Sequence, residues 1–237
     1  MTLFAGKPDS GKSTVCLDII TRVTRGTDWP DGSKNTLGPR NVLMAVAEDD
    51  LSDTVIPRLN AAGADLTRVN ILNNVRVKDY SEEESTDEVR RLQLDKDAEK
   101  LKKAVEANPS IALGVVDTVT SYFGDVNTNA DKDVRPVMDA LAKAFRDCGA
   151  CFLGVVHVNK RSDADAIQKI LGASSVAGAV RAAWNFSRDP DNHEEFVMAR
   201  IKSETQPKFS AASAALVLIL DASFARTAGP HSEHPLP

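Results

Sequence analysis

Positive charge, long apolar runs and cysteine are all scarce in this sequence, and each shortage excludes a class of protein. The 237 residues carry a formal net charge of -5 at pH 7, which argues against a general binder of polyanions, although a local basic loop can still grip phosphates. The longest apolar stretches, such as Ala214 to Leu220, fall far short of the roughly 20 residues that a membrane span requires. We therefore expect a cytoplasmic protein with no membrane contact.

The cysteines are too few for a disulfide scaffold. Cys16, Cys148 and Cys151 cannot all pair with one another. Cys148 and Cys151 have the C-x-x-C spacing of redox sites, but a predicted helix ends at Gly149, an apolar strand follows, and no second pair completes a zinc site. We expect these cysteines to be structural and the compartment to be reducing.

The length of the chain predicts one domain. With 42% apolar residues it can form one sizeable core, and nothing requires a second. We expect residues 1–226 to form this domain. Residues 227–237 contain proline and histidine without an apolar period, which predicts a disordered tail. A charged stretch from Lys78 to Asp87 is expected to be a mobile excursion.

Strand-like and helix-like patterns alternate along most of the domain. Apolar runs predict strands at Thr2–Ala5, Asn41–Ala47, Val69–Leu72, Ile111–Val116 and Ala150–Val156. Helical spacing predicts helices at about Lys12–Arg25, Leu51–Ala62, Asp95–Ala107, Val134–Phe145 and Ser174–Arg181.

This alternation predicts an α/β fold with a mainly parallel central sheet and helices on both faces. Near the C-terminus, Ala183–Ser187 and Glu195–Ile201 flank a turn rich in Asp, Pro and Asn, which predicts an antiparallel hairpin at the sheet edge. In such sheets, ligands bind at the carboxyl ends of the strands.

The segment from Gly6 to Ser13 fits the phosphate-binding pattern G-x-x-x-x-G-K-[ST]. Glycines let its backbone N–H groups turn inward, and the helix that follows adds its positive N-terminal end. We expect Lys12 to reach the β- and γ-phosphates of ATP and the Ser13 hydroxyl to ligate Mg²⁺. The residues expected to bind ATP are Gly6, Lys7, Pro8, Asp9, Ser10, Gly11, Lys12, Ser13 and Thr14.

Three further polar residues end predicted strands. Asp117 has the placement expected of the acid that orients Mg²⁺ from opposite the phosphate loop. Glu48 is the better candidate for the general base that holds the attacking water, although an acid there can also serve a helix N-terminus, a role that suits Asp49 or Asp50 better. His157 can hydrogen-bond the γ-phosphate or the water, or be merely structural.

With this order of motifs, the chain resembles the RecA-like P-loop ATPases, and most closely the hexameric replicative helicases of the plasmid RepA type and related domains of phage and mobile-element primase-helicases. The resemblance extends from Thr2 to about Lys202. The segments that carry it are Val42–Asp50, Arg58–Ala64, Val115–Asp117, Val156–Lys160 and Gly172–Ser175, ending at Arg181.

The resemblance implies a role for each matched residue. Glu48 would be the catalytic glutamate, Asp117 the magnesium-side aspartate and His157 the sensor of the γ-phosphate. Arg181 would act on the ATP of the next subunit, with Arg200 and Lys202 as second candidates, so the resemblance implies a ring homo-oligomer, a hexamer. Single-stranded DNA would contact the loop that holds Lys160, Arg161 and Lys169.

Two features depart from the family pattern. Asp9 stands where many phosphate loops have glycine, which puts a carboxylate near the phosphates unless it points outward. The chain also begins close to the loop, so a leading segment is expected to be missing or unusually short.

Two other functions remain open. An ATP-gated scaffold of the recombinase or regulatory kind would assemble on ATP without unwinding DNA. A small-molecule kinase is disfavoured, because the sequence offers no arginine-rich lid.

Overall fold

The computed structural model describes residues 1–79, 86–127, 130–158, 176, 180–189, 191–192, 195–203 and 215–218. The strands are β1 (Thr2–Gly6), β2 (Asn41–Val46), β3 (Val69–Ile71), β4 (Asn74–Asp79), β5 (Thr86–Arg91), β6 (Ile111–Asp117), β7 (Cys151–His157), β8 (Ala182–Arg188), β9 (Phe196–Ser203) and β10 (Ala215–Leu218). The helices are α1 (Lys12–Arg25), α2 (Ile56–Ala61), α3 (Leu94–Glu106) and α4 (Asp131–Asp147), with short turns at η1 (Leu51–Val55), η2 (Leu66–Arg68) and η3 (Val119–Tyr122).

One large sheet forms the centre of the molecule, with the strand order β10-β9-β8-β1-β7-β6-β2-β3. The strands from β8 to β3 run parallel, whereas β8, β9 and β10 pair antiparallel. This confirms the predicted mainly parallel sheet and the predicted hairpin of β8 and β9, to which β10 adds one more strand. β1 lies inside the sheet, so the loop that follows it opens at the middle of the carboxyl edge.

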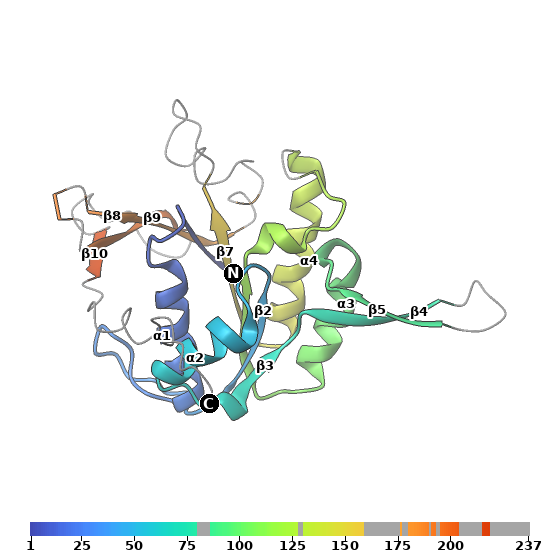
Figure 1. The fold of residues 1–237 in the computed structure, drawn as a ribbon, viewed down its shortest axis with the longest axis horizontal. Coiled ribbons are helices and arrows are strands. Elements are labelled where there is room, and N and C mark those ends of the chain that lie inside the picture. Colours follow the sequence, from blue (N-terminus) through green and yellow to red (C-terminus); the bar gives the residue numbers. More distant parts are fainter. Residues whose placement is uncertain are drawn as a thin grey trace, which may run out of the picture.

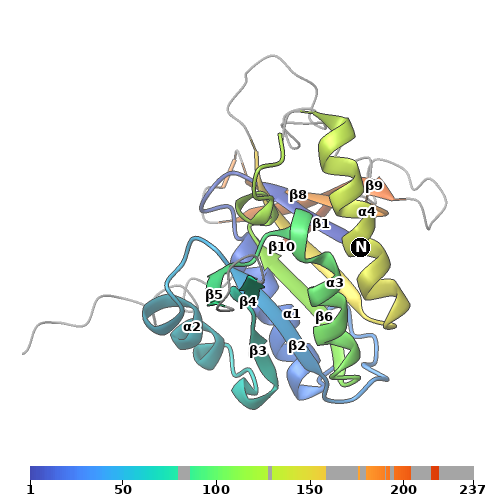
Figure 2. The ribbon, with the colours of Figure 1, turned by 90° about the vertical axis from the view of Figure 1, so that its right-hand side faces the viewer.

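The helices cover both faces of this sheet, as predicted (Figure 1). Turned by a quarter, the view separates α1 and α2 on one face from α3 and α4 on the other (Figure 2). Successive strand residues serve the two faces in turn: Leu3 and Ala5 pack in the cluster of α3 and α4, while Phe4 packs against α1. This alternation of period two, buried on both sides, is why the strands read as continuous apolar runs.

Two segments differ from the sequence prediction. The stretch expected as a mobile excursion supplies strand residues, because β4 and β5 pair antiparallel from Asn74↔Arg91 to Asp79↔Thr86. The helix predicted at about Leu51–Ala62 is divided: a π-helical turn closes with the Ile56 N–H donating to the Leu51 carbonyl, and α2 then starts around Pro57. Proline has no N–H to donate, so it fits a helix start better than a helix interior.

Some predictions concern residues outside those described. They are the body of the helix at Ser174–Arg181, the loop holding Lys160, Arg161 and Lys169, and the tail at 227–237. None of the helices that the structure describes is both long and apolar enough to cross a bilayer. The cysteines are free, and Cys148 and Cys151 lie where α4 ends and β7 begins, as expected.

Candidate functional site

The predicted phosphate loop joins the end of β1 to the start of α1, and its backbone requires two of its glycines. Gly11 has a φ of 86°, in the left-handed region that glycine adopts without steric cost. A Cβ atom on Gly6 would lie 2.5 Å from the Phe186 carbonyl oxygen and 2.7 Å from Ser10 Oγ. Only glycine therefore allows the loop to pack this closely against β8.

Lys12 lies inside this loop, and its side chain is almost fully buried. Its Nζ donates to the carbonyl oxygens of Gly6 at 3.0 Å and Lys7 at 2.6 Å, and to Ser10 Oγ at 3.3 Å. Burial lowers the pKa of Lys12, while the nearby Asp117 carboxylate opposes the shift. The first turn of α1 carries no acidic residue, so a positive helix terminus and an ammonium group both face the loop.

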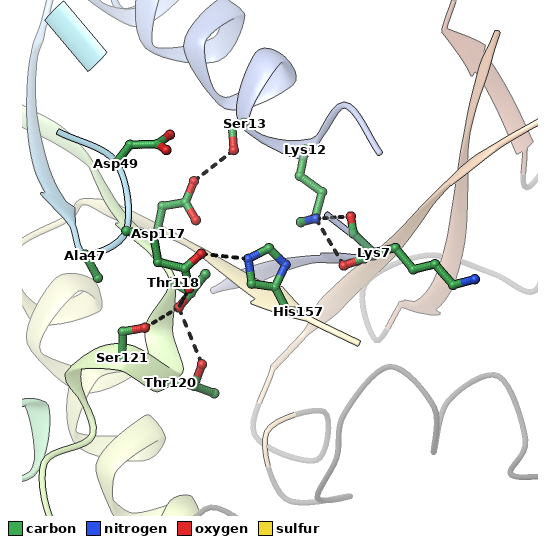
Figure 3. A network of polar contacts seen from close by, with 12 residues as sticks. Lys7, Lys12, Ser13, Ala47, Asp49, Asp117, Thr118, Thr120, Ser121 and His157 are labelled. Atoms are coloured by element: carbon green, nitrogen blue, oxygen red, sulfur yellow. Dashed lines mark hydrogen bonds and ion pairs between the residues drawn. The ribbon is translucent and has the colours of Figure 1, made fainter. Parts of the chain in front are cut away.

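Ser13 and Asp117 meet across the edge of the sheet (Figure 3). Ser13 Oγ donates to Asp117 Oδ2 at 3.1 Å. Burial raises the pKa of Asp117 and so does the Glu48 carboxylate, whereas the Ser13 hydrogen bond, His157 and Lys12 lower it. A hydroxyl beside a buried carboxylate suits Mg²⁺, which is commonly held by one or two protein oxygens together with substrate phosphates and water. Among the described residues no group of three or more His, Cys, Asp or Glu forms a complete metal cage.

Glu48 and His157 are brought together from different strand ends. Glu48 Oε2 lies 3.0 Å from His157 Nε2, and Glu48 Oε1 accepts a hydrogen bond from Thr118 Oγ1 at 3.1 Å. The single hydroxyl proton of Thr118 is thus directed at Glu48, so Ser121 Oγ donates in its 2.7 Å contact with Thr118. Asp49 lies apart from this network (Figure 3) and faces Arg58 at 3.7 Å.

The contact with Glu48 fixes the proton of His157. A carboxylate only accepts, so Nε2 carries the hydrogen. Nδ1 is buried and has no hydrogen-bond partner among the described residues. In this arrangement the Nε2–H is occupied by Glu48, and turning toward a phosphate would release the carboxylate.

Register explains why these residues converge. Gly6 pairs with His157 across β1 and β7, and Asp117 pairs with Val46 across β6 and β2. The parallel strands therefore end side by side, and Glu48 follows β2 by two residues. The candidate site combines a phosphate-binding loop, a magnesium-type carboxylate and a carboxylate placed to accept a proton.

The predicted trans residues lie elsewhere. Arg181 precedes the amino end of β8, where its backbone N–H donates to the Met1 carbonyl. Ala183 in β8 pairs with Lys202 in β9 and with Leu3 in β1, so Lys202 also lies toward the amino end of β1, whereas Gly6 and the loop lie at its carboxyl end. Arg200 pairs with Trp184, one position nearer the loop. The structure does not bring Arg181 or Lys202 into the site of their own chain.

Two features of the site were not anticipated from the sequence. Thr118, noted only as the neighbour of Asp117, is a hydrogen-bond donor to Glu48. Arg91, from the unpredicted strand β5, donates to the carbonyl of Ala47, the residue before Glu48. Asp9, flagged as a departure, has a φ of 55° and is exposed, a conformation that Asp tolerates better than most residues.

We expect Asp117→Asn to raise the melting temperature of the nucleotide-free protein by a few degrees at neutral pH. Because burial raises the pKa of Asp117 in the folded state, ionisation of this group opposes folding above its ordinary pKa, and the penalty fades as the pH falls through the folded value. The difference between variant and wild type should therefore shrink on acidification. Thermal unfolding in EDTA across pH measures it, and a variant less stable than wild type at pH 7 would contradict this reasoning.

Comparison with known proteins agrees with this geometry. A family model described as an AAA domain matches residues 1–163, and no curated protein matches the chain. Among solved structures, an ATPase domain is similar with a TM-score of 0.66 and 10% identity, covering 95% of this chain and 82% of that one. The RadB recombinase is similar with a TM-score of 0.57 and 14% identity, covering 87% of this chain and 82% of that one. The fold is that of a RecA-like P-loop ATPase.

Proposed function

Because this chain belongs to the AAA domain family, whose model spans residues 1–163, we propose that it is a Mg²⁺-dependent ATPase that forms a ring and acts as a replicative DNA helicase of a plasmid, phage or mobile element. The observation that carries the ATPase proposal is the convergence of Lys12, Ser13, Asp117, Glu48 and His157 at one edge of the sheet. The free cysteines favour a reducing compartment, the cytoplasm.

The phosphate loop would bind the substrate. Backbone N–H groups at the start of α1 and the Lys12 ammonium face the position where the β- and γ-phosphates would lie. Ser13 and Asp117 would hold Mg²⁺, which neutralises phosphate charge when bound. Lys12 would exchange its carbonyl acceptors for phosphate oxygens, and this exchange explains how a buried ammonium can be ready for an anion.

Glu48 would supply the general base. A water oxygen attacks the γ-phosphorus, the bond from that phosphorus to the ADP oxygen breaks, and the water proton passes to the Glu48 carboxylate. Thr118 orients this carboxylate through its hydroxyl. His157 would turn its Nε2–H from Glu48 toward the γ-phosphate, so that the carboxylate becomes free to take the proton when ATP is in place.

Completion of the site would require a neighbouring subunit. Phosphoryl transfer gains from a cation on the γ-phosphate, and Arg181 is exposed toward the opposite edge of the sheet from the loop of its own chain. A neighbour that presents its Arg181, Arg200 or Lys202 to this loop would supply that cation. Such a contact joins two different surfaces, which is the head-to-tail arrangement that closes into rings. Six subunits and single-stranded DNA as partner are proposed on the resemblance.

The test is ATP hydrolysis by the purified protein with and without single-stranded DNA. We expect DNA to stimulate turnover, and Arg181→Ala to lower it about 10³-fold or more while MgATP still binds. Arg135→Ala, on the exposed side of α4, is the matched control. Mixing Arg181→Ala with Lys12→Ala should restore part of the activity, because some interfaces then pair an intact loop with an intact arginine. Two inactive proteins that stay inactive when mixed would refute the shared site.

A second candidate is a scaffold of the recombinase or regulatory kind that assembles on ATP. Glu48 is held by both Thr118 and His157, and a base engaged in this way favours slow hydrolysis. This function predicts assembly on MgATP, turnover that does not respond to DNA, and no strand separation. Sedimentation with ATP and a duplex-unwinding assay distinguish it from the helicase.

A further inference from the structure

Strands β4 and β5 form an arm that stands away from the main body (Figure 1). They make a two-stranded sheet of their own, which no strand of the large sheet joins. The arm's last residues, Arg90 and Arg91, lie next to each other at its base. Neighbouring strand residues point to opposite faces, so these two cations serve different contacts.

Arg90 anchors the arm to α3. Its Nη1 and Nη2 donate to the two carboxylate oxygens of Asp97 at 2.7 and 3.0 Å. The side chain of Asp97 has no exposed surface and also accepts from the Gln93 N–H and from Lys100. This buried, fully paired carboxylate fixes the position of the arm's base relative to the domain.

Arg91 reaches the catalytic edge instead. Its Nη2 donates to the Ala47 carbonyl oxygen at 3.0 Å, and its guanidinium lies 4.8 Å from the centre of the Tyr122 ring. Ala47 is the residue before Glu48. Tyr122 ends the η3 turn, which follows directly on Thr118, the hydroxyl donor to Glu48. One side chain of the arm therefore contacts both segments that hold the carboxylate.

A second set of hydrogen bonds makes this contact rigid. Asn73 Oδ1 accepts from the Tyr122 hydroxyl and from the Val46 N–H, each at 2.9 Å. The Ala47 N–H donates to the Asp117 carbonyl oxygen at 2.7 Å. Tyr122 is almost fully buried. The backbone at Val46 and Ala47 is thus tied on three sides, and Arg91 is the tie that comes from the arm.

We propose that Arg91 is a positioning residue for Glu48, through which the β4–β5 arm controls how the water-activating carboxylate is held. The inference rests on the proposed ATPase function. Arg91 contacts no reacting atom: it acts on the Ala47 carbonyl, and a small displacement there moves the next residue. Because a group misplaced by an ångström can slow a reaction strongly, the hydrolytic step should be sensitive to this contact, whereas binding at the phosphate loop should not.

The experiment compares Arg91→Ala with Arg91→Lys and with Arg76→Ala, which removes an exposed arginine from the other strand of the same arm. For Arg91→Ala we expect kcat to fall about tenfold, with the KM for MgATP and the Kd for a fluorescent ATP analogue unchanged within about twofold. Arg91→Lys keeps a cation and a donor, so it should recover most of the turnover. Arg76→Ala should match the wild type.

The outcomes separate this inference from the function on which it rests. Stoichiometric binding of the analogue shows that each variant is folded, since a purely structural defect would lower stoichiometry and turnover in proportion. If Arg91→Ala turns over ATP like Arg76→Ala, or if its binding falls together with its kcat, Arg91 does not position Glu48. If the wild type and Arg76→Ala bind ATP without hydrolysing it, the proposed ATPase function itself fails, and the inference falls with it.

Discussion

Glu48→Gln is expected to lower ATP turnover by about 10²–10⁴-fold, the usual contribution of a positioned general base, while leaving MgATP binding close to that of the wild type. The amide keeps the size of the side chain and can still accept the hydrogen bond from Thr118. What it loses is the capacity to take a proton from the attacking water. Single-turnover hydrolysis and equilibrium binding of the same preparation measure the two properties separately.

Asp49→Asn is the control for Glu48→Gln, because it removes the next carboxylate along the chain. Asp49 faces Arg58 at 3.7 Å and both side chains are about half exposed, so the ion pair contributes little. We expect its turnover to be near that of the wild type. Loss of turnover in Asp49→Asn with activity retained in Glu48→Gln would reverse the assignment and make Glu48 the helix-terminal acid that the sequence left open.

Lys12→Ala is expected to abolish turnover by removing substrate binding. The ammonium is buried among three oxygen acceptors, and truncating one partner of a buried charged contact costs about 2–5 kcal/mol. A loss of that size weakens binding of MgATP by roughly 30-fold to several thousand-fold. The loop should keep its fold, because its glycine at position 11 and the packing of Gly6 against β8 do not depend on the side chain.

Titration of a fluorescent ATP analogue tests the Lys12 prediction directly. Lys143→Ala is a suitable control, since Lys143 is an exposed lysine of α4 paired only with Asp147 at 2.9 Å. The variant and the control should differ in affinity and agree in melting temperature without nucleotide. Wild-type affinity in Lys12→Ala would show that ATP does not bind at this loop.

Much of the site could be predicted because it depends on local order along the chain. A strand that ends in a polar residue presents that residue at the carboxyl edge, so Asp117 and His157 could be placed without knowing which strands are neighbours. The phosphate loop is defined by one short segment with a strand before it and a helix after it. The paired positions Gly6↔His157 and Val46↔Asp117 confirm that these ends lie side by side.

The contacts that could not be predicted are those between segments with no shared motif. Arg91 follows a charged stretch whose composition is typical of a solvated loop, and only pairing with β4 makes it a strand residue. Its target is a backbone carbonyl, which leaves no trace in the sequence. The alternation of Val75 and Val77 before the charged stretch, with Val89 after it, was the available signal of a hairpin. The Thr118 contact depends in the same way on the meeting of β6 with the segment after β2.

The interior place of β1 has a consequence for how the molecule is made. β1 is synthesised before every other described strand, yet Thr2 pairs with Leu153 on one side and with Ala182 on the other. Contacts between residues so distant in sequence form slowly, since a long stretch of chain must be ordered before they are made. The bed on which the phosphate loop rests is therefore completed only after β8 has left the ribosome, and ATP in the cell can stabilise only those nascent chains that have been translated to that point.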